Sequence, residues 1–183
     1  MKLPICMQIQ SGENGLAAVQ SILGYYKKFV PTEELRKHCN ESRNGIAIDQ
    51  LLLLANHYQL KGEISSVSFD ELKTIKLPCI ITWKRKYYVV LKSIKNKVVK
   101  IMDPSKGNVT LTLEKLQKDY GGKVLTLEKD GNFKPSGKKD NSFRLIKNRL
   151  GHYKGALIFF ITYLIMMFIA SRNYIYMFLG FHL

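Results

Sequence analysis

The first third of the chain carries apolar residues at helical spacing. Between Asn14 and Phe29, apolar side chains recur at intervals of three or four positions, at Leu16, Val19, Ile22, Leu23 and Tyr26. This spacing predicts a helix with one apolar face. A second, short helix is expected to begin at Pro31–Thr32, because threonine is a good N-cap. A third helix is predicted over Ala47 to Tyr58, which has a broad leucine-rich face.

Beyond the third helix the pattern changes to short runs of β-branched and aromatic residues separated by turn-forming residues. These runs predict strands at 80–83, 87–94, 98–102 and 109–111, a brief helix at 113–120 and a last strand at 123–127. Asn96 is expected to supply the hairpin turn between the second and third strands. Helices first and an antiparallel sheet afterwards predict an α+β fold.

The C-terminal part of the chain differs in composition from the rest. Residues 131–141 read as a linker, and Ser142–Tyr153 as a basic amphipathic helix. Seventeen residues without a charge follow at 155–171, and they favour a membrane-spanning helix over a re-entrant or interfacial segment. The expected organisation is therefore a domain at 1–128, a basic juxtamembrane linker at 129–154, and a transmembrane segment with an apolar tail at 155–183.

The chain is strongly basic, with a formal net charge of +15 over 183 residues. Such a balance suggests an anionic partner: nucleic acid, acidic lipid or an acidic peptide. Eight Lys/Arg and two Asp fall between Lys129 and Lys154, a net of +6 directly before the apolar run. By the positive-inside rule this flank predicts a single-pass protein of the cell membrane whose N-terminal domain is cytoplasmic. Much of the charge is then explained without nucleic acid, which we do not expect as a partner.

The cysteines and the nucleotide-binding motifs limit the chemistry further. Cys6, Cys39 and Cys79 are widely spaced and form no CxxC pair, so we expect reduced thiols and no zinc site. The sequence contains no GxxxxGK[ST], which excludes a P-loop nucleotide site. No cofactor and no metal are expected.

Several motifs in a fixed order resemble one peptidase family. They are QIQSGENGLA (8–17), GYY (24–26), VPTEELR (30–36), CNESRNG (39–45), LPCI (77–80), YYVVL (87–91) and DPSKG (103–107). The chain resembles the double-glycine leader peptidases, the papain-like cysteine-peptidase domains that begin bacterial peptide-exporting ABC transporters. VLTLE (124–128) and FKPSG (133–137) resemble the exporter subfamily with nitrile-hydratase-like leader peptides. The resemblance covers roughly residues 5 to 170 and implies a papain-like fold, a helical half with an antiparallel sheet.

The resemblance also implies where the catalytic groups should lie. The position of the nucleophilic cysteine is occupied by Asn14 and that of the catalytic histidine by Tyr87, whereas Gln8 of the oxyanion site and the orienting Asp103 are retained. A carboxamide offers no thiolate, and a phenol with a pKa of about 10 is a poor base at pH 7. We therefore expect a catalytically degenerate domain with no intact catalytic set.

The remaining cysteines and histidines do not form a convincing replacement dyad. Cys39 is expected to be a small buried hydrophobe and His57 a helix-end residue. His38 is expected to be solvated, and Cys6 and Cys79 to lie in the core.

A cleft between the helical half and the sheet binds the leader peptide in the resembling family. Trp83, Tyr87 and Tyr88 are candidates to line such a cleft, although core packing of Trp83 and Tyr88 is the plainer interpretation. The leading hypothesis is a membrane-anchored, non-catalytic module that binds a leader peptide or ABC exporter subunits during peptide export. The alternatives are a residual cysteine peptidase for double-glycine leaders and a basic membrane-surface binding module.

Overall fold

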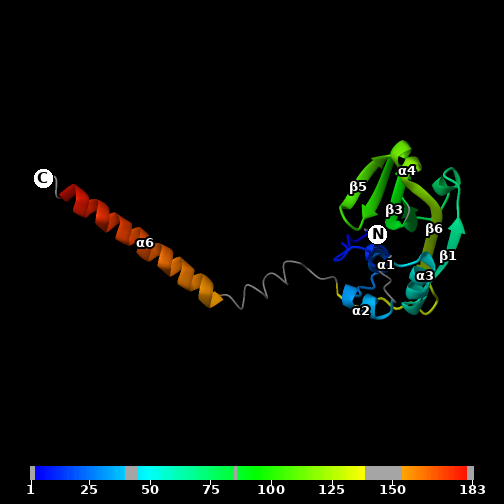
Figure 1. The fold of residues 1–183 in the computed structure, drawn as a ribbon. Helices are drawn as coiled ribbons and strands as arrows, with labels where there is room; N and C mark the ends of the chain where they lie inside the picture. The colour runs from blue at the N-terminus through cyan, green and yellow to red at the C-terminus, as the bar shows by residue number, and fades with distance from the viewer. Residues whose placement is uncertain (1–2, 40–44, 85, 139–153, 181–183) are drawn as a thin grey trace. The chain divides into compact units, whose positions relative to one another are not determined.

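The computed structural model describes residues 3–39, 45–84, 86–138 and 154–180, and the chain divides into two compact units, Met1–Lys139 and Asp140–Leu183. The first unit begins with three helices, α1 (Asn14–Tyr25), α2 (Thr32–Lys37) and α3 (Ile48–His57), and continues into a six-stranded sheet (Figure 1). Helices before strands is the order that the sequence predicts, and the α+β class is confirmed.

The sheet is antiparallel throughout, with the strand order β1-β6-β2-β3-β4-β5. Its strands are β1 (Leu60–Ser66), β2 (Cys79–Trp83), β3 (Tyr87–Lys95), β4 (Val98–Asp103), β5 (Gly107–Thr112) and β6 (Tyr120–Lys129). The turn between β3 and β4 contains Asn96 at φ 52°, a left-handed conformation that asparagine tolerates well. This position confirms the predicted hairpin.

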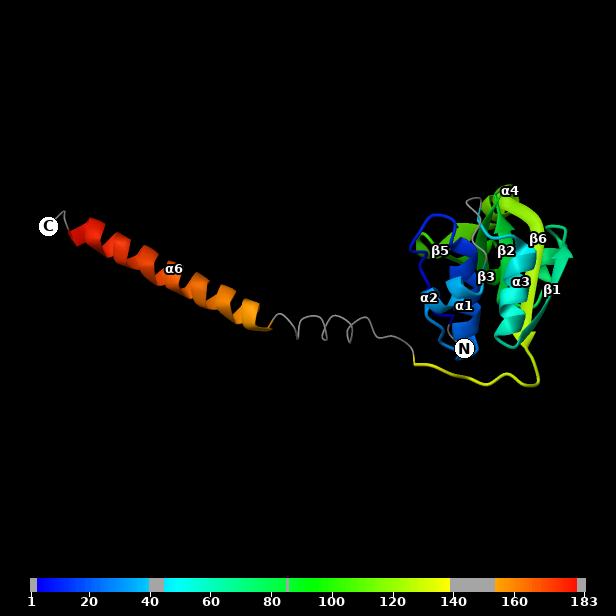
Figure 2. The ribbon, with the colours of Figure 1, turned by 60° about the horizontal axis from the view of Figure 1, so that its bottom comes forward.

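Each face of the sheet has its own apolar core. On one face α1 and α3 pack against the strands (Figure 2), with Leu16, Ile22 and Leu51 fully buried. On the other face a second cluster includes Leu116 of α4 (Leu113–Asp119) and Leu72 of the 3-10 helix η1 (Glu71–Lys73). Each such buried side chain stabilises the fold by about 1.5–3 kcal/mol. The strands are therefore held from both sides.

Two elements differ from the sequence prediction. Helix α1 ends at Tyr25 and not at Phe29, and Lys27 adopts a positive φ of 67° just after it, which a continuing helix excludes. Strand β1 was not predicted at all, because at the edge of the sheet most of its side chains remain exposed or half-buried. Such a strand lacks the apolar alternation on which the prediction rests.

The segment after β6 returns to the helical half of the domain. The N–H of Phe29 donates to the carbonyl of Ser136 at 2.8 Å, and the ring of Phe133 lies edge-on to that of Tyr26. A Cβ on Gly137, at φ 78°, would meet the Phe29 carbonyl oxygen at 2.2 Å. Glycine is thus required at this crossing. Residues 130–138 form a docked strap and not a free linker.

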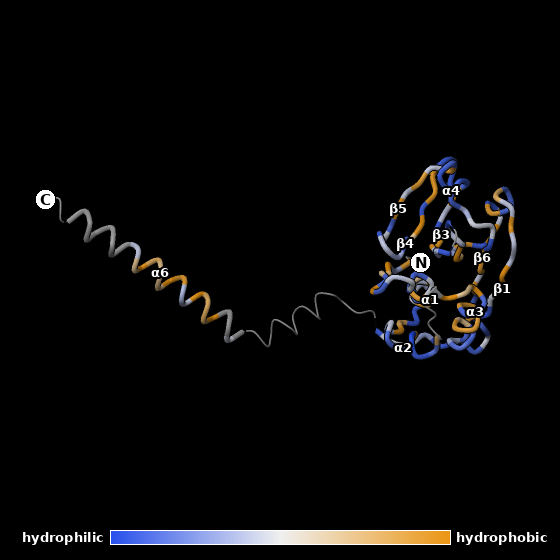
Figure 3. Tube along the Cα trace, viewed as in Figure 1, coloured by the Kyte–Doolittle hydropathy of each residue, from blue (hydrophilic) through white to orange (hydrophobic). Residues whose placement is uncertain are grey.

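The second unit contains α6 (Lys154–Gly180), which is largely hydrophobic between Ile158 and Ile169 (Figure 3). The apolar side chains of this stretch are exposed. Among the residues that the structure describes, no helix has the length and apolar character needed to cross a membrane. This finding contradicts the transmembrane helix predicted at 155–171. The helix predicted at Ser142–Tyr153 lies outside the described residues.

Candidate functional site

Asn14 is the first residue of α1, and its side chain forms a hydrogen bond with strand β3 of the sheet. The residue is 6% exposed, and its Oδ1 accepts a hydrogen bond of 3.0 Å from the backbone N–H of Tyr88 in β3. Position 14 and the start of β3 are therefore neighbours, as the resemblance implies. The carboxamide thus satisfies a buried donor of the strand.

Tyr87, the first residue of β3, forms the second half of the arrangement. Its hydroxyl donates to Oδ1 of Asp103 at 2.9 Å, and the same oxygen accepts from the N–H and the hydroxyl of Ser105, both at 2.8 Å. Burial is the largest cause raising the pKa of Tyr87, and the bond to Asp103 raises it further. Burial opposes ionisation of Asp103, but the three donated hydrogen bonds and Lys106 outweigh it and lower the Asp103 pKa. The phenol stays neutral near pH 7 and donates to a carboxylate; it is not a base.

Gln8 lies on the extended N-terminal segment beside this pair. Its backbone N–H donates to the carbonyl of Pro104 at 2.9 Å, next to Asp103. Its side-chain Oε1 is buried and meets no hydrogen-bond partner among the residues described. The atom without a partner is an acceptor, whereas the oxyanion role that the resemblance implies for Gln8 would use the Nε2 donors.

A buried ion pair that the sequence analysis missed holds this N-terminal segment. Glu13 is 3% exposed, accepts from the N–H groups of Ile9 and Gln10 at 3.1 and 2.9 Å, and pairs with Arg36 of α2. The hydrogen bond from Arg36 is the largest cause lowering the pKa of Glu13 and exceeds the opposing effect of burial. Glu13 thus fixes the loop that places Gln8 and Asn14. The sequence feature that could have indicated this role is an acidic residue, Glu13, immediately before the predicted start of the first helix.

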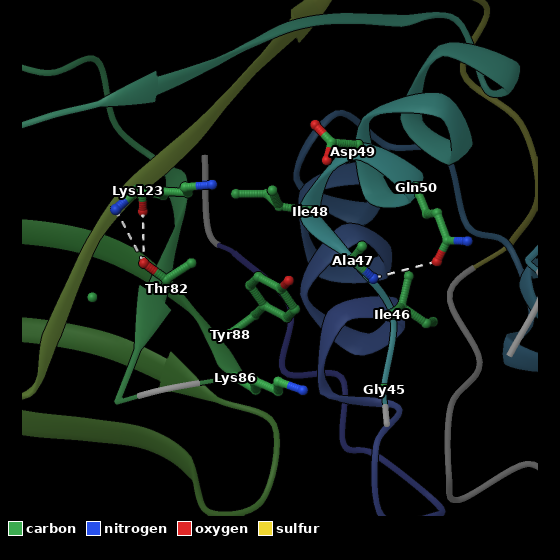
Figure 4. Close-up of a pocket in the computed structure, with 11 residues that line it drawn as sticks. Gly45, Ile46, Ala47, Ile48, Asp49, Gln50, Thr82, Lys86, Tyr88 and Lys123 are labelled. Carbon is green, nitrogen blue, oxygen red and sulfur yellow. Dashed lines mark hydrogen bonds between the residues drawn. The ribbon is translucent and has the colours of Figure 1, made fainter. Parts of the chain in front are cut away.

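A cavity of about 550 Å³ lies between the N-terminus of α3 and one end of the sheet (Figure 4). Residues of the α3 approach, from Gly45 to Gln50, form one wall, and Thr82, Lys86, Tyr88, Gly121 and Lys123 form the other. Helix α1 approaches closely at Gly15, where a Cβ would meet Leu51 at 2.8 Å and Tyr88 at 3.3 Å. The cavity therefore adjoins the helix that carries Asn14.

The three aromatic residues proposed for peptide binding do not line one cleft. Trp83 and Tyr87 are paired across β2 and β3 and belong to the second core cluster, whereas Tyr88 belongs to the first. Side chains alternate between the two faces of a strand, so Tyr87 and Tyr88 cannot point the same way. Trp83 is 7% exposed and packs in the core. Of the three, only Tyr88 lines the cavity.

The remaining thiols and imidazoles lie elsewhere. The rings of His38 and His57 lie 4.0 Å apart at the C-terminal ends of α2 and α3, a contact that the sequence did not predict. Cys39 packs against the first core cluster near Tyr58, also at that end. The cavity is at the opposite end of α3, about 15 Å away along the helix. Cys6 is half-buried, and Cys79 is fully buried, which raises its pKa to about 12. Within the described ranges, no three His, Cys, Asp or Glu side chains gather as a metal site.

Comparisons with known proteins agree with this geometry. The Peptidase C39 family matches residues 2–132. The colicin V secretion/processing ATP-binding protein CvaB of Escherichia coli is 28% identical over 124 residues, which cover 68% of this chain and 18% of that protein. The probable microcin-H47 secretion/processing ATP-binding protein MchF of Escherichia coli is 29% identical over the same length. The chain thus spans about a fifth of the curated relatives it matches.

Solved structures show the same fold. A double glycine motif protease from an AMS/PCAT transporter, crystallised with the leader peptide, is 36% identical with a TM-score of 0.68, covering 70% of this chain and 92% of that one. The peptidase domain of Streptococcus ComA matches with a TM-score of 0.66 at 17% identity, over 70% of this chain and 100% of that one. The family match extends over most of the first unit, from the segment of Gln8 to the docked strap. The chain belongs to the Peptidase C39 family.

Proposed function

We propose that this chain is a non-catalytic member of the family that binds the leader peptide of an exported peptide, beside or within an ABC exporter. One observation carries the proposal. The two positions where the family places its nucleophile and its base are both occupied by groups engaged in structural hydrogen bonds, Asn14 to the Tyr88 N–H and Tyr87 to Asp103. Neither group can attack a peptide carbonyl at neutral pH.

The binding half of the proposal is supported by what surrounds these two positions. The segment of Gln8, the Glu13–Arg36 pair that holds it and the cavity beside α3 are all formed. The protease that is 36% identical to this chain was crystallised with a leader peptide. A chain that keeps a formed cavity without a nucleophile can retain peptide affinity while cleavage is lost.

The full chain should bind synthetic double-glycine leader peptides saturably and leave them intact. Fluorescence anisotropy measures the first property and mass spectrometry the second. The absence of saturable binding would remove the proposal. Cleavage by the natural chain would replace it by the residual peptidase, and loss of that cleavage in Cys39→Ala would identify the substitute nucleophile.

The variant Asn14→Cys/Tyr87→His supplies the matched positive control. Asp103 accepts the Tyr87 hydroxyl at 2.9 Å and is therefore placed to orient an imidazole at position 87. We expect this double variant to cleave the same peptides, and each single variant to be at least about 100-fold slower, because nucleophile and base act as one unit. Restored cleavage would assign the loss of activity to these two side chains and not to the scaffold.

A further inference from the structure

Strand β5 forms the free edge of the sheet, at the opposite end from β1 (Figure 1). It pairs with β4 over all six residues without a register shift, and none of those residues is charged or a proline. Edge strands are normally protected against further pairing by charges, proline or a bulge. The other edge strand, β1, has such protection in the exposed residues Lys61 and Glu63. Strand β5 lacks it and can therefore accept one more strand.

The pairing of β5 determines which of its backbone groups point away from the sheet. Just beyond the strand, the N–H of Leu113 donates to the carbonyl of Lys97 at 3.1 Å. In an antiparallel pair, residues bonded to the partner alternate with residues whose N–H and C=O point outward. Counting back from Leu113 in steps of two, the odd-numbered residues of β5 bond to β4, and the N–H and C=O groups of Asn108 and Thr110 point outward.

The outer side of the strand is accessible beyond its first residue. The N-terminal segment approaches β5 at Gly107, where a Cβ would lie 3.6 Å from Ile5. The side chains of Asn108, Thr110 and Thr112, which follow, are exposed. The outward groups of β5 are therefore open to a further chain segment.

The sheet face beside this edge carries lysines. Met102 of β4 lies in the core cluster under α1, so Lys100 and Val98 lie on the same face as Met102. The register places Thr110 opposite Lys100, and Lys95 of β3 opposite Val98. Both lysines are exposed, and none of the residues that β3, β4 and β5 place on this face is acidic. This lysine face favours acidic side chains beside it.

The opposite face of β5 is apolar. Val109 and Leu111 are half-buried and pack against the second core cluster. Side chains of a strand alternate between its two faces, so a strand added beside β5 would place every second side chain next to these two residues. The edge therefore fits a segment in which acidic and apolar residues alternate.

We propose that β5 is a docking edge for an extended segment of a partner protein, with acidic side chains on the lysine face and apolar side chains on the other face. Addition of a strand to a sheet edge is a common mode of peptide recognition. Neighbouring strands lie about 4.8 Å apart, so the added strand would lie about 10 Å from β4, a distance that a lysine and a glutamate side chain span together. Docking at β5 goes beyond the proposed function and does not require that the chain binds a leader peptide.

A second copy of this chain fits the edge less well. Two copies joined edge to edge in one antiparallel sheet would have their lysine faces on the same side. The lysines of both copies would then repel each other across the junction. Charge complementarity therefore favours an acidic partner over self-association.

The probe is a heptapeptide with blocked ends that alternates four glutamates with three valines. We expect the full chain to bind it saturably in fluorescence anisotropy. The affinity should be about fivefold higher than for the same peptide with glutamine in place of glutamate, as two exposed ion pairs would give. Equal affinities, or the absence of saturable binding, would overturn the proposal.

Two N-methylated forms of the probe test the backbone pairing without any change to the protein. In an antiparallel addition the glutamate N–H groups face β5, whereas in a parallel addition the valine N–H groups do. Methylation of the facing set should abolish binding, and methylation of the other set should leave it nearly unchanged. Equal effects of the two methylated peptides would exclude pairing along the edge.

Variants of the chain place the binding on β5. Thr110→Pro removes an outward N–H and none of the bonds to β4, so it should weaken binding at least about tenfold and leave the urea midpoint of Trp83 fluorescence nearly unchanged. Lys95→Gln and Lys100→Gln should each weaken binding about twofold, and less at high salt. Lys118→Gln is the matched control, because this exposed lysine lies on α4, which packs on the other face of the sheet. Unchanged affinity in Thr110→Pro would refute the docking edge.

Two further measurements separate this edge from other occupants. Sedimentation velocity that finds a dimer of the natural chain, lost in Thr110→Pro, would assign the edge to a second copy and overturn the proposed partner. Displacement of the bound probe by a double-glycine leader peptide would place the probe in the leader site and also overturn it. Binding of the probe by a chain that binds no leader peptide would support the docking edge and reject the proposed function.

Discussion

The replacement Asn14→Cys should make the protein less stable, although cysteine is the residue that the family uses at this position. Asn14 is 6% exposed and its Oδ1 is the acceptor for the Tyr88 N–H at 3.0 Å. A thiol is a weak acceptor, so the substitution leaves a buried strand donor without a good partner. An unsatisfied buried donor costs about 1–3 kcal/mol of unfolding free energy. The two side chains differ little in size, so the cavity contribution should be small.

Urea denaturation of the full chain measures this change. Trp83 is the only tryptophan and is buried in the second core cluster, so its fluorescence reports unfolding of the first unit. With a slope of about 2 kcal/mol/M, a loss of about 2 kcal/mol lowers the midpoint by about 1 M. Hydrogen exchange of the Tyr88 amide should accelerate by the factor that this free energy gives, about 30-fold.

Ser21→Ala is the matched control on the same helix. Ser21 is fully buried, and its hydroxyl contacts only the Met102 sulfur at 3.9 Å among the described partners, a weak interaction. Its removal should change the midpoint much less than Asn14→Cys. Equal midpoints for Asn14→Cys and the natural chain, together with unchanged exchange at Tyr88, would refute the structural role of the carboxamide.

Four further predictions concern other parts of the domain. Tyr87→Phe removes a hydrogen bond that lowers the Asp103 pKa, so NMR titration should find that pKa higher in the variant. The stability that a depressed carboxyl pKa contributes is lost as the pH falls through the folded-state pKa. The variant should therefore lose less stability on acidification than the natural chain. Glu13→Gln breaks the pair with Arg36 and should lower the free energy of unfolding by about 3 kcal/mol at pH 7, as measured by urea denaturation. Because the Glu13 pKa is lowered from 4.5, the difference in stability between variant and natural chain should shrink below pH 4.5. A difference that stays constant down to pH 3 would contradict the ion-pair assignment. Cys79, with a pKa of about 12, should resist iodoacetamide at pH 7.5 until urea unfolds the domain, as peptide mass spectrometry would record. Gly137→Ala should accelerate proteolysis within residues 130–138, whereas Gly131→Ala, which meets nothing within 4 Å, should not.

The sequence predicted the four α-helices of the first unit and most of its strands, because these depend on local periodicity, and motif order indicated that position 14 lies near the start of β3. It could not predict β1, an edge strand whose exposed side chains carry no apolar alternation. It also grouped Tyr87 with Tyr88, although adjacent strand residues face opposite sides and only the structure fixes which side meets α1.

The Glu13–Arg36 pair was missed for a related reason. It joins residues 23 positions apart, and neither the loop before α1 nor the short helix α2 has a periodicity that indicates their contact. Local sequence patterns do not reveal contacts between distant segments, nor the polar atoms that those contacts leave without a partner.

The docked strap determines how mechanical load would enter the domain. Because the Ser136 carbonyl bonds to the Phe29 N–H, tension on the chain beyond Lys138 would act first on the turn after α1 and not on the end of β6. This crossing, together with the Phe133–Tyr26 ring contact and the hydrogen bond from the Lys134 N–H to Gln59, would rupture before any strand of the sheet is separated. A force applied from the C-terminal side would thus detach and extend residues 130–138 while the cavity and both cores stay intact.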